Sequence, residues 1–341
     1  MRFSSRRPKL RRAILASVVT GAAALVASFT IDADHDSVSR ASAAVRPAGR
    51  SAAGACGSAS ASTVSAVEEA AARRILAGEL HGAEVRADIG HITSSQALLS
   101  AMAGSNPAAV QAAVHALVYA PHWHIVRLRV LKGGRVLADV GGPYIIAPVT
   151  GTLRWHGRTV GSYVMSVQDD VGFVKLVSRF IGVPIDIYRN GSFLMGTLKP
   201  APPSVNNGTT VTSAGSTYRA SVMQAGAFPS GSLEIALFTK APAATSGSCA
   251  AVRSAAWGSV AAHIAARFKP LPTHYKDLVD LVRSTTGGVA FVRTGSKQLA
   301  GGPGPTKLPL GGTVTYRGRP WSVFSFEPAP PARIYLLTPR E

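Results

Sequence analysis

Three arginines on segments of alternating character are the side chains best suited to binding a small molecule. Arg127 and Arg129 alternate with apolar residues over 125–130, and Arg154 lies on a later segment of the same kind. A guanidinium group can bind a carboxylate through two parallel hydrogen bonds, so these arginines suit an anionic ligand if they face a pocket. The alternative is that they line a solvated face of a sheet. The candidate ligand-binding set is completed by Ser166, Gln168 and Lys175.

Two pairs of polar residues have structural explanations that compete with chemical ones. His122 and His124 could supply metal ligands, but two ligands are only half of a zinc site, and exposed histidines at the start of a strand are the favoured reading. Asp169 and Asp170 could bind Ca²⁺ or act as acid and base. Carboxylates are also favoured at the N-terminus of a helix, and we prefer this capping role.

Motifs of common enzyme classes are missing from the sequence. It contains no Gly-x-Ser-x-Gly nucleophile motif, no His-Glu-x-x-His zinc motif, no phosphate-binding loop and no dinucleotide fingerprint. We therefore predict a binding protein rather than an enzyme, with no cofactor and no metal.

The elements that position these residues are repeated along the chain. Residues 185–238 run parallel to residues 289–337, and an earlier partial copy begins at residue 125. A repeat fixes the folding unit, which here is a run of short strands joined by tight turns. Proline-rich stretches at 199–204 and 303–309 occupy the same place in two copies, between the second and third predicted strands.

Predicted helices precede the strands. Apolar residues recur at helical spacing before the first copy and again before the third, over residues 63–87, 95–103, 107–119, 250–268 and 274–284. Residues 171–180 read as a helix, although 173–177 could instead form the last strand of the first copy. Helices gathered beside antiparallel strands predict an α+β protein.

This arrangement resembles a known family of sensor domains. Two strands, a long loop and three strands against N-terminal helices resemble the PDC or Cache extracytoplasmic sensor domains, which are PAS-like, and the actinobacterial type is most similar. The resemblance covers residue 62 to the C-terminus and is sharpest over Gly151–Phe173. It implies an α+β fold of tandem PAS/Cache-like antiparallel sheets flanked by N-terminal helices.

The resemblance also implies a function. Family members bind small ligands, often carboxylates or amino acids, between the sheet and its covering loops, and take part in signal transduction. The sequence stops at Glu341, directly after the last predicted strand, so we expect a sensor-like protein without its own transmitter domain. It would report to a partner, such as a membrane protein.

The N-terminus predicts export. Six basic residues precede an uncharged stretch over 13–31, which is the order found in signal peptides and is also close to the length needed to span a bilayer. A cleaved signal peptide and a membrane anchor formed by residues 13–31 both remain open, and either places the protein outside the cytoplasm. We expect residues 1–31 to form this segment and 32–61 a flexible linker, followed by three sensor-like units at 62–182, 183–248 and 249–341.

The two cysteines fit an exported protein. Cys56 and Cys249 each precede an alanine-rich helical segment, and two such cysteines can form one disulfide outside the cytoplasm. That bond would tie the start of the first unit to the start of the third.

The chain is strongly basic, with a formal net charge of +19. Nine Lys/Arg and three Asp give the first 50 residues a charge of +6, which leaves +13 for the remainder. A basic surface attracts polyanions, but these basic residues are scattered singly and no aromatic stacking motif accompanies them, so we expect no nucleic-acid partner. The alternative function is a basic cell-envelope protein that binds acidic polymers or a partner receptor.

Overall fold

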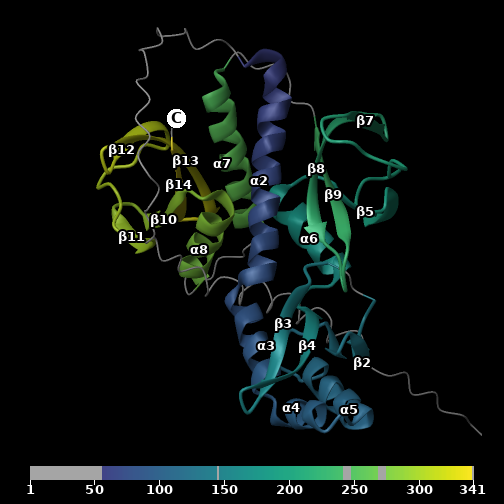
Figure 1. The fold of residues 1–341 in the computed structure, drawn as a ribbon. Coiled ribbons are helices and arrows are strands. Elements are labelled where there is room, and N and C mark those ends of the chain that lie inside the picture. The colour runs from purple at the N-terminus through teal and green to yellow at the C-terminus, as the bar shows by residue number, and fades with distance from the viewer. Residues whose placement is uncertain (1–55, 144–145, 241–246, 268–273, 340–341) are drawn as a thin grey trace, which may run out of the picture.

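The computed structural model describes residues 56–143, 146–240, 247–267 and 274–339 (Figure 1). The predicted export segment and residues 32–55 of the predicted linker lie outside these ranges, and residues 57–61 begin the first helical segment. None of the helices in these ranges is long and apolar enough to span a membrane.

The predicted α+β class is confirmed, with antiparallel sheets in tandem and helices beside them (Figure 1). The helical segments are η2 (Gly57–Ala59), α2 (Ser60–His81), α3 (Ala83–Ser94), α4 (Gln96–Ala103), α5 (Pro107–Val118), α6 (Asp170–Ile181), α7 (Cys249–Arg267) and α8 (Tyr275–Thr286).

The strands form three sheets. The first has the order β2-β1-β4-β3, from β1 (Arg127–Lys132), β2 (Arg135–Gly141), β3 (Val149–Trp155) and β4 (Arg158–Ser166). The second has the order β6-β5-β9-β8-β7, from β5 (Ile185–Arg189), β6 (Ser192–Gly196), β7 (Thr210–Ser213), β8 (Ser216–Gly226) and β9 (Ser232–Lys240). The third has the order β11-β10-β14-β13-β12, from β10 (Val289–Thr294), β11 (Lys297–Ala300), β12 (Gly311–Tyr316), β13 (Arg319–Ala329) and β14 (Ala332–Pro339).

The two five-stranded sheets share one topology, in which the first strand lies between the second and the fifth. The proline-rich stretches fall between the second and third strands of each sheet, as predicted. Equivalent positions on the first strands hold these loops: the Tyr188 hydroxyl donates to the Pro202 carbonyl (2.9 Å), and Arg293 Nη2 donates to the Pro305 carbonyl (2.6 Å).

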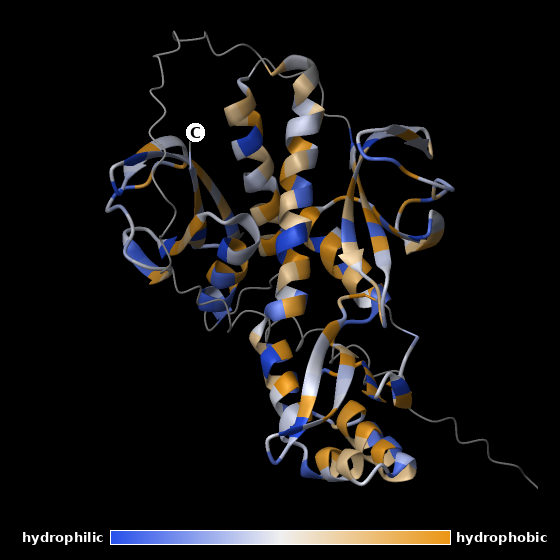
Figure 2. Ribbon diagram, viewed as in Figure 1, coloured by the Kyte–Doolittle hydropathy of each residue, from blue (hydrophilic) through white to orange (hydrophobic). Residues whose placement is uncertain are grey.

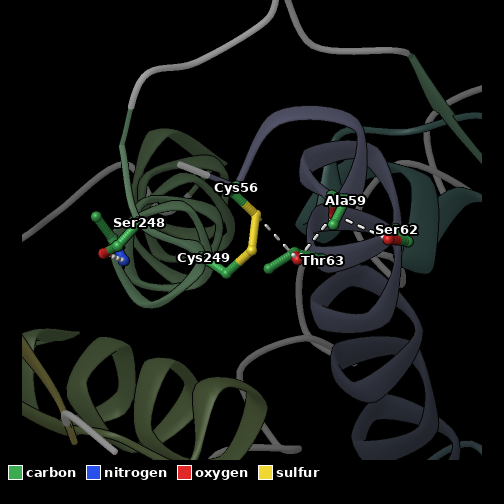
Figure 3. The surroundings of a disulfide bond; sticks show 7 residues. Cys56, Ala59, Ser62, Thr63, Ser248 and Cys249 are labelled. Atoms are coloured by element: carbon green, nitrogen blue, oxygen red, sulfur yellow. Dashed lines mark hydrogen bonds between the residues drawn. A yellow bond between two sulfur atoms is a disulfide. The ribbon is translucent and has the colours of Figure 1, made fainter. Parts of the chain in front are cut away.

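The two long helices, α2 and α7, lie side by side with their N-terminal ends together (Figure 1). A disulfide between Cys56 and Cys249 joins these ends, and the Cys56 Sγ atom lies 3.6 Å from Thr63 Oγ1 (Figure 3). The short helices α6 and α8 pack against the long ones. The sheet β5–β9 and the sheet β10–β14 flank this layer of helices on opposite sides (Figure 1).

We call this assembly of four helices and two sheets the helix body, and one hydrophobic core joins the four helices and both sheets. It contains buried side chains from both long helices, both short helices and both five-stranded sheets, among them Ala71, Phe173, Ile235, Ile264, Leu281 and Leu336. The inner faces of the two sheets are therefore covered by the same four helices.

The remaining elements, α3–α5 and β1–β4, form what we call the inserted lobe. It has a separate core that includes Ile92, Met102, Leu128 and Met165. Figure 2 shows the hydrophobic residues of α4 and α5 gathered at the foot of the molecule. The lobe lies between α2 and α6 in the sequence, whereas only residues 268–274 separate α7 from α8. The helix body thus consists of two copies of a unit built from a long helix, a short helix and a five-stranded sheet. The predicted boundaries at 182/183 and 248/249 remain predictions.

Two local predictions are confirmed and a third is wrong. Residues 171–180 are helical, and Asn106 caps α5 by accepting a hydrogen bond from the Ala109 N–H (3.1 Å), as its place before Pro107 predicts. The helix predicted over 63–87 is instead two helices. Gly82 separates them in an extended conformation (ψ 170°), and a Cβ atom there would lie 2.7 Å from the Gly78 carbonyl oxygen.

Candidate functional site

Two of the predicted ligand-binding arginines meet at one carboxylate. Arg127 and Arg129 on β1 both donate to Asp139 on β2, over distances of 2.6–3.0 Å. Burial alone would raise the pKa of Asp139, but hydrogen bonds and charge from the two arginines hold that pKa below its usual value. The guanidinium carbons lie 4.2 Å (Arg127) and 5.5 Å (Arg129) from the centre of the Phe228 ring.

This arginine cluster is a contact between the inserted lobe and the helix body. Phe228 is buried and lies between β8 and β9, and the neighbouring Ala227 forms an isolated β-bridge with Ile146. Cation–π contacts of this kind stabilise an interface by about 0.5–2 kcal/mol. A role for Arg127 and Arg129 in ligand binding remains a prediction.

Ser166 and Gln168 also lie together, at the connection between β4 and α6. The Ser166 hydroxyl is 2.7 Å from the Ile146 carbonyl and 2.9 Å from the Gln168 carbonyl. The adjacent aspartates are used structurally: Asp169 accepts from the Gly172 N–H to cap α6 (2.6 Å), and Asp170 accepts from the Ile146 N–H (2.9 Å).

The other two predicted residues are exposed. Arg154 lies on β3 and Lys175 on α6. Within the described ranges, no hydrogen bond or ion pair joins either of them to the four residues above. The predicted set is therefore divided between the arginine cluster, the β4–α6 connection and two solvated positions.

A cleft that the sequence did not indicate lies where the two copies of the helix body meet. It has a volume of about 420 Å³ and opens between the end of α6, the start of β5 and the end of α7. Its lining residues are Ser178, Arg179, Gly182, Val183, Pro184, Thr197, His263 and Arg267. Three of these side chains are basic and none is acidic, so we call it the basic cleft.

Glycine at position 182 makes room for the histidine of the basic cleft. Gly182 ends α6 in the left-handed conformation (φ +85°), which turns the chain into β5. A Cβ atom there would lie 2.3 Å from Nε2 of His263. His263 Nδ1 lies 2.9 Å from the Ser259 carbonyl. Because a carbonyl can only accept, Nδ1 carries the hydrogen and the ring is held with Nε2 toward Gly182.

The charges in the basic cleft favour an anion. Arg179 and Arg267 are exposed, and guanidinium groups bind carboxylates and phosphates through paired hydrogen bonds. They also offset the partial negative charges at the C-terminal ends of α6 and α7. Thr197 contributes less, because its hydroxyl accepts a hydrogen bond from the Ile185 N–H (2.9 Å).

The second copy has a corresponding groove between the end of α8 and α2, and it is filled. Gly287 ends α8 in the left-handed conformation (φ +67°), and a Cβ atom there would lie 2.6 Å from the guanidinium group of Arg74. Arg74 Nη1 donates to the Thr285 carbonyl (3.2 Å), and the guanidinium lies 5.0 Å from the centre of the Trp257 ring. The remaining cavity beside Arg74 measures only about 20 Å³.

No family model and no curated protein matches this chain. Among solved structures, the periplasmic domain of Vibrio cholerae LuxQ is similar over 54% of this chain and 99% of its own length, with 11% sequence identity and a TM-score of 0.30. A TM-score this low does not establish a shared fold.

Proposed function

We propose that this chain is an extracytoplasmic, sensor-like protein that binds a small anionic ligand in the basic cleft, without converting it. The observation that carries the proposal is the lining of the basic cleft, with three basic side chains and no acidic one. The Cys56–Cys249 disulfide supports a location outside the cytoplasm, because such bonds persist in oxidising compartments.

The dimensions of the basic cleft suit a small molecule. Its volume of about 420 Å³ falls in the range of about 300–1,000 Å³ that is usual for ligand pockets. Arg179 and Arg267 supply the charge, and they come from different copies of the helix body. A ligand held by both would favour one relative position of the copies, which is how binding can be reported to a partner. We propose a membrane protein as that partner.

The test is calorimetric titration of the purified full chain with a panel of carboxylates, amino acids and inorganic phosphate. We expect at least one anion to bind, and we expect Arg179→Ala or Arg267→Ala to weaken binding tenfold or more, since a charged hydrogen bond contributes about 1.5–3 kcal/mol. Arg283→Ala is the matched control, because Arg283 occupies the last turn of α8 as Arg179 does in α6. Absence of binding across the panel, or equal losses in all three variants, contradicts the proposal.

The net charge of +19 supports a second candidate function, the binding of acidic envelope polymers. Binding to a polyanion through scattered charges weakens as salt shortens the Debye length from about 10 Å at 0.1 M to about 3 Å at 1 M. Retention on an acidic cell-wall polymer at low salt that is lost at high salt, and that is unchanged in Arg179→Ala, would favour this second function over the first.

A further inference from the structure

We propose that the joint between α2 and α3 is a proton-controlled latch. Its three carboxylates, Glu79, Glu84 and Asp88, hold the inserted lobe against the helix body when they are protonated, and they loosen that contact when they are ionised. This inference is independent of the proposed ligand.

The joint is a single residue long. α2 ends at His81 and α3 begins at Ala83, with Gly82 between them in an extended conformation. α2 contributes to the core of the helix body, and α3 contributes Val85 and Ile92 to the core of the inserted lobe. A change in the backbone at Gly82 therefore alters how the two cores meet.

Two of the three carboxylates are buried with an oxygen left unpaired. Glu79, in the last turns of α2, is 4% exposed, and Asp88 on α3 is 2% exposed. Oε1 of Glu79 and Oδ2 of Asp88 have no hydrogen-bond partner among the described residues. Buried polar atoms are nearly always hydrogen-bonded, and a proton on either carboxyl group would convert an unpaired acceptor into a donor.

The groups facing these carboxylates come from four segments. α3 supplies Glu84 and His91, and the segment before β1 supplies His124, whose Nδ1 contacts Glu84 Oε1 and whose backbone N–H donates to Asp88. The β4–α6 connection supplies Gln168, which donates to Glu79. Arg74 on α2 lines the same small cavity as Glu79. Its guanidinium donates instead to the Thr285 carbonyl of α8.

The pKa values support protonation near neutral pH. Burial, and then the charge of Glu84, raises the pKa of Glu79 to about 7. Burial raises the pKa of Glu84 to about 7, and it raises that of Asp88 to about 6 against the opposing effect of His124.

The sign of the pH dependence follows from these shifts. Each folded-state pKa lies above its ordinary value of 4.5 or 3.8, so protonation favours the closed joint. This stabilisation is complete below about pH 4 and is lost as the pH rises through about 6 to 7. At about pH 8 the charge of Glu84 repels those of both Glu79 and Asp88.

A second contact between lobe and body does not respond to pH in this range. Asp139 has a lowered pKa and the arginines stay charged. The contact of Arg127 and Arg129 with Phe228 therefore persists both below and above the range of about pH 6 to 7 in which the three carboxylates ionise. We expect the lobe to remain attached there while the joint around Gly82 opens.

Hydrogen exchange of the purified full chain tests the proposal. Protection of residues 79–92 is measured at about pH 5.5 and about pH 8, each corrected for the intrinsic exchange rate, with residues 250–262 of α7 as an internal reference. We expect protection of the joint to fall about tenfold at the higher pH, since one pKa unit corresponds to a tenfold change in an equilibrium, and α7 to change little. Equal protection of the joint at both pH values overturns the proposal.

Amide variants separate the latch from a general effect of pH. The triple change Glu79→Gln, Glu84→Gln and Asp88→Asn imitates the protonated state and is expected to remove the pH dependence. Glu68→Gln is the matched control, because Glu68 is another buried glutamate of α2 with a pKa of about 7, but it bonds to Thr239 on β9. If the triple variant fails to fold, Glu84→Gln alone is expected to reduce the pH response. A response that survives in the amide variants, or one that disappears in Glu68→Gln, overturns the proposal.

Discussion

The two copies of the helix body have an equivalent groove, which is open in the first copy and filled in the second. In both, a twelve-residue helix ends at a left-handed glycine beside the long helix of the other copy. Arg267 and Arg74 each lie eighteen residues after the disulfide cysteine that precedes their long helix. Arg267 lines the open basic cleft, whereas Arg74 fills its groove and bonds to Thr285. The two copies share a topology, so individual side chains determine whether the groove beside the glycine is open or filled.

The outer faces of the two five-stranded sheets differ in the same way. In the first copy, Asp186 is fully buried on β5, and its Oδ1 accepts from the Leu198 N–H (3.1 Å). At the matching place on β10, Phe291 packs against Tyr316, with ring centroids 6.2 Å apart. At this position the first copy thus keeps a titratable group where the second has a buried aromatic ring.

Removing the disulfide should have the largest effect, because it holds the two copies together at the N-terminal ends of α2 and α7. The two cysteines are 193 residues apart, and a loop of that length corresponds to roughly 5 kcal/mol of stability in the chain-entropy account. We expect Cys56→Ser with Cys249→Ser to lose about 4 to 5 kcal/mol in denaturant unfolding. A loss under about 1 kcal/mol would mean that helix packing alone joins the copies.

Truncating the aromatic cluster of the second copy should come next. Phe291→Ala removes a fully buried ring from the outer face of β10, and such changes cost about 3–5 kcal/mol. Denaturant unfolding of the variant measures this cost. A near-neutral result would show that the packing of Phe291 does not stabilise the second copy.

The matching change in the first copy should have the opposite sign. Burial raises the pKa of Asp186 to about 6, so its ionisation weakens the folded state as the pH rises from about 4 to about 6. Asp186→Asn removes that charge and should stabilise the protein at pH 7, on the order of 2 kcal/mol. Unfolding free energies measured from pH 4 to pH 7 should show a weaker pH dependence in the variant. A variant less stable than the natural chain at pH 7 contradicts this account.

The two helix-ending glycines offer the sharpest test of the difference between cleft and groove. Gly182→Ala and Gly287→Ala each force a left-handed alanine, at a cost of about 1–2 kcal/mol. Only Gly182→Ala also displaces His263 from the basic cleft. We expect similar losses of stability in both variants and loss of anion binding in Gly182→Ala alone, measured by calorimetric titration. Equal anion binding in the two variants would mean that the anion does not bind in the basic cleft.

Much of the fold could be predicted because it depends on local patterns. Strand alternation, the repeated turns and the cap at Asn106 are all short-range signals, and the structure contains them. The break at Gly82 could not be predicted, because a single glycine is tolerated inside a helical pattern. The placement of α3–α5 and β1–β4 as a lobe beside the helix body is likewise a consequence of long-range packing.

The candidate site was harder to predict than the fold. Alternation on β1 shows that Arg127 and Arg129 share a face, but it does not reveal Asp139 or Phe228 as their partners. The basic cleft combines residues 178–184 and 197 with 263 and 267, and each of its basic residues stands alone in the sequence. Only the packing of α6 beside α7 brings them together.

A crystal structure of the full chain with an anion identified by titration tests the central claim most directly. We predict ligand density in the basic cleft, within hydrogen-bond reach of Arg179 and Arg267, and none in the groove that Arg74 fills. A ligand bound elsewhere, with the basic cleft empty, would contradict the account.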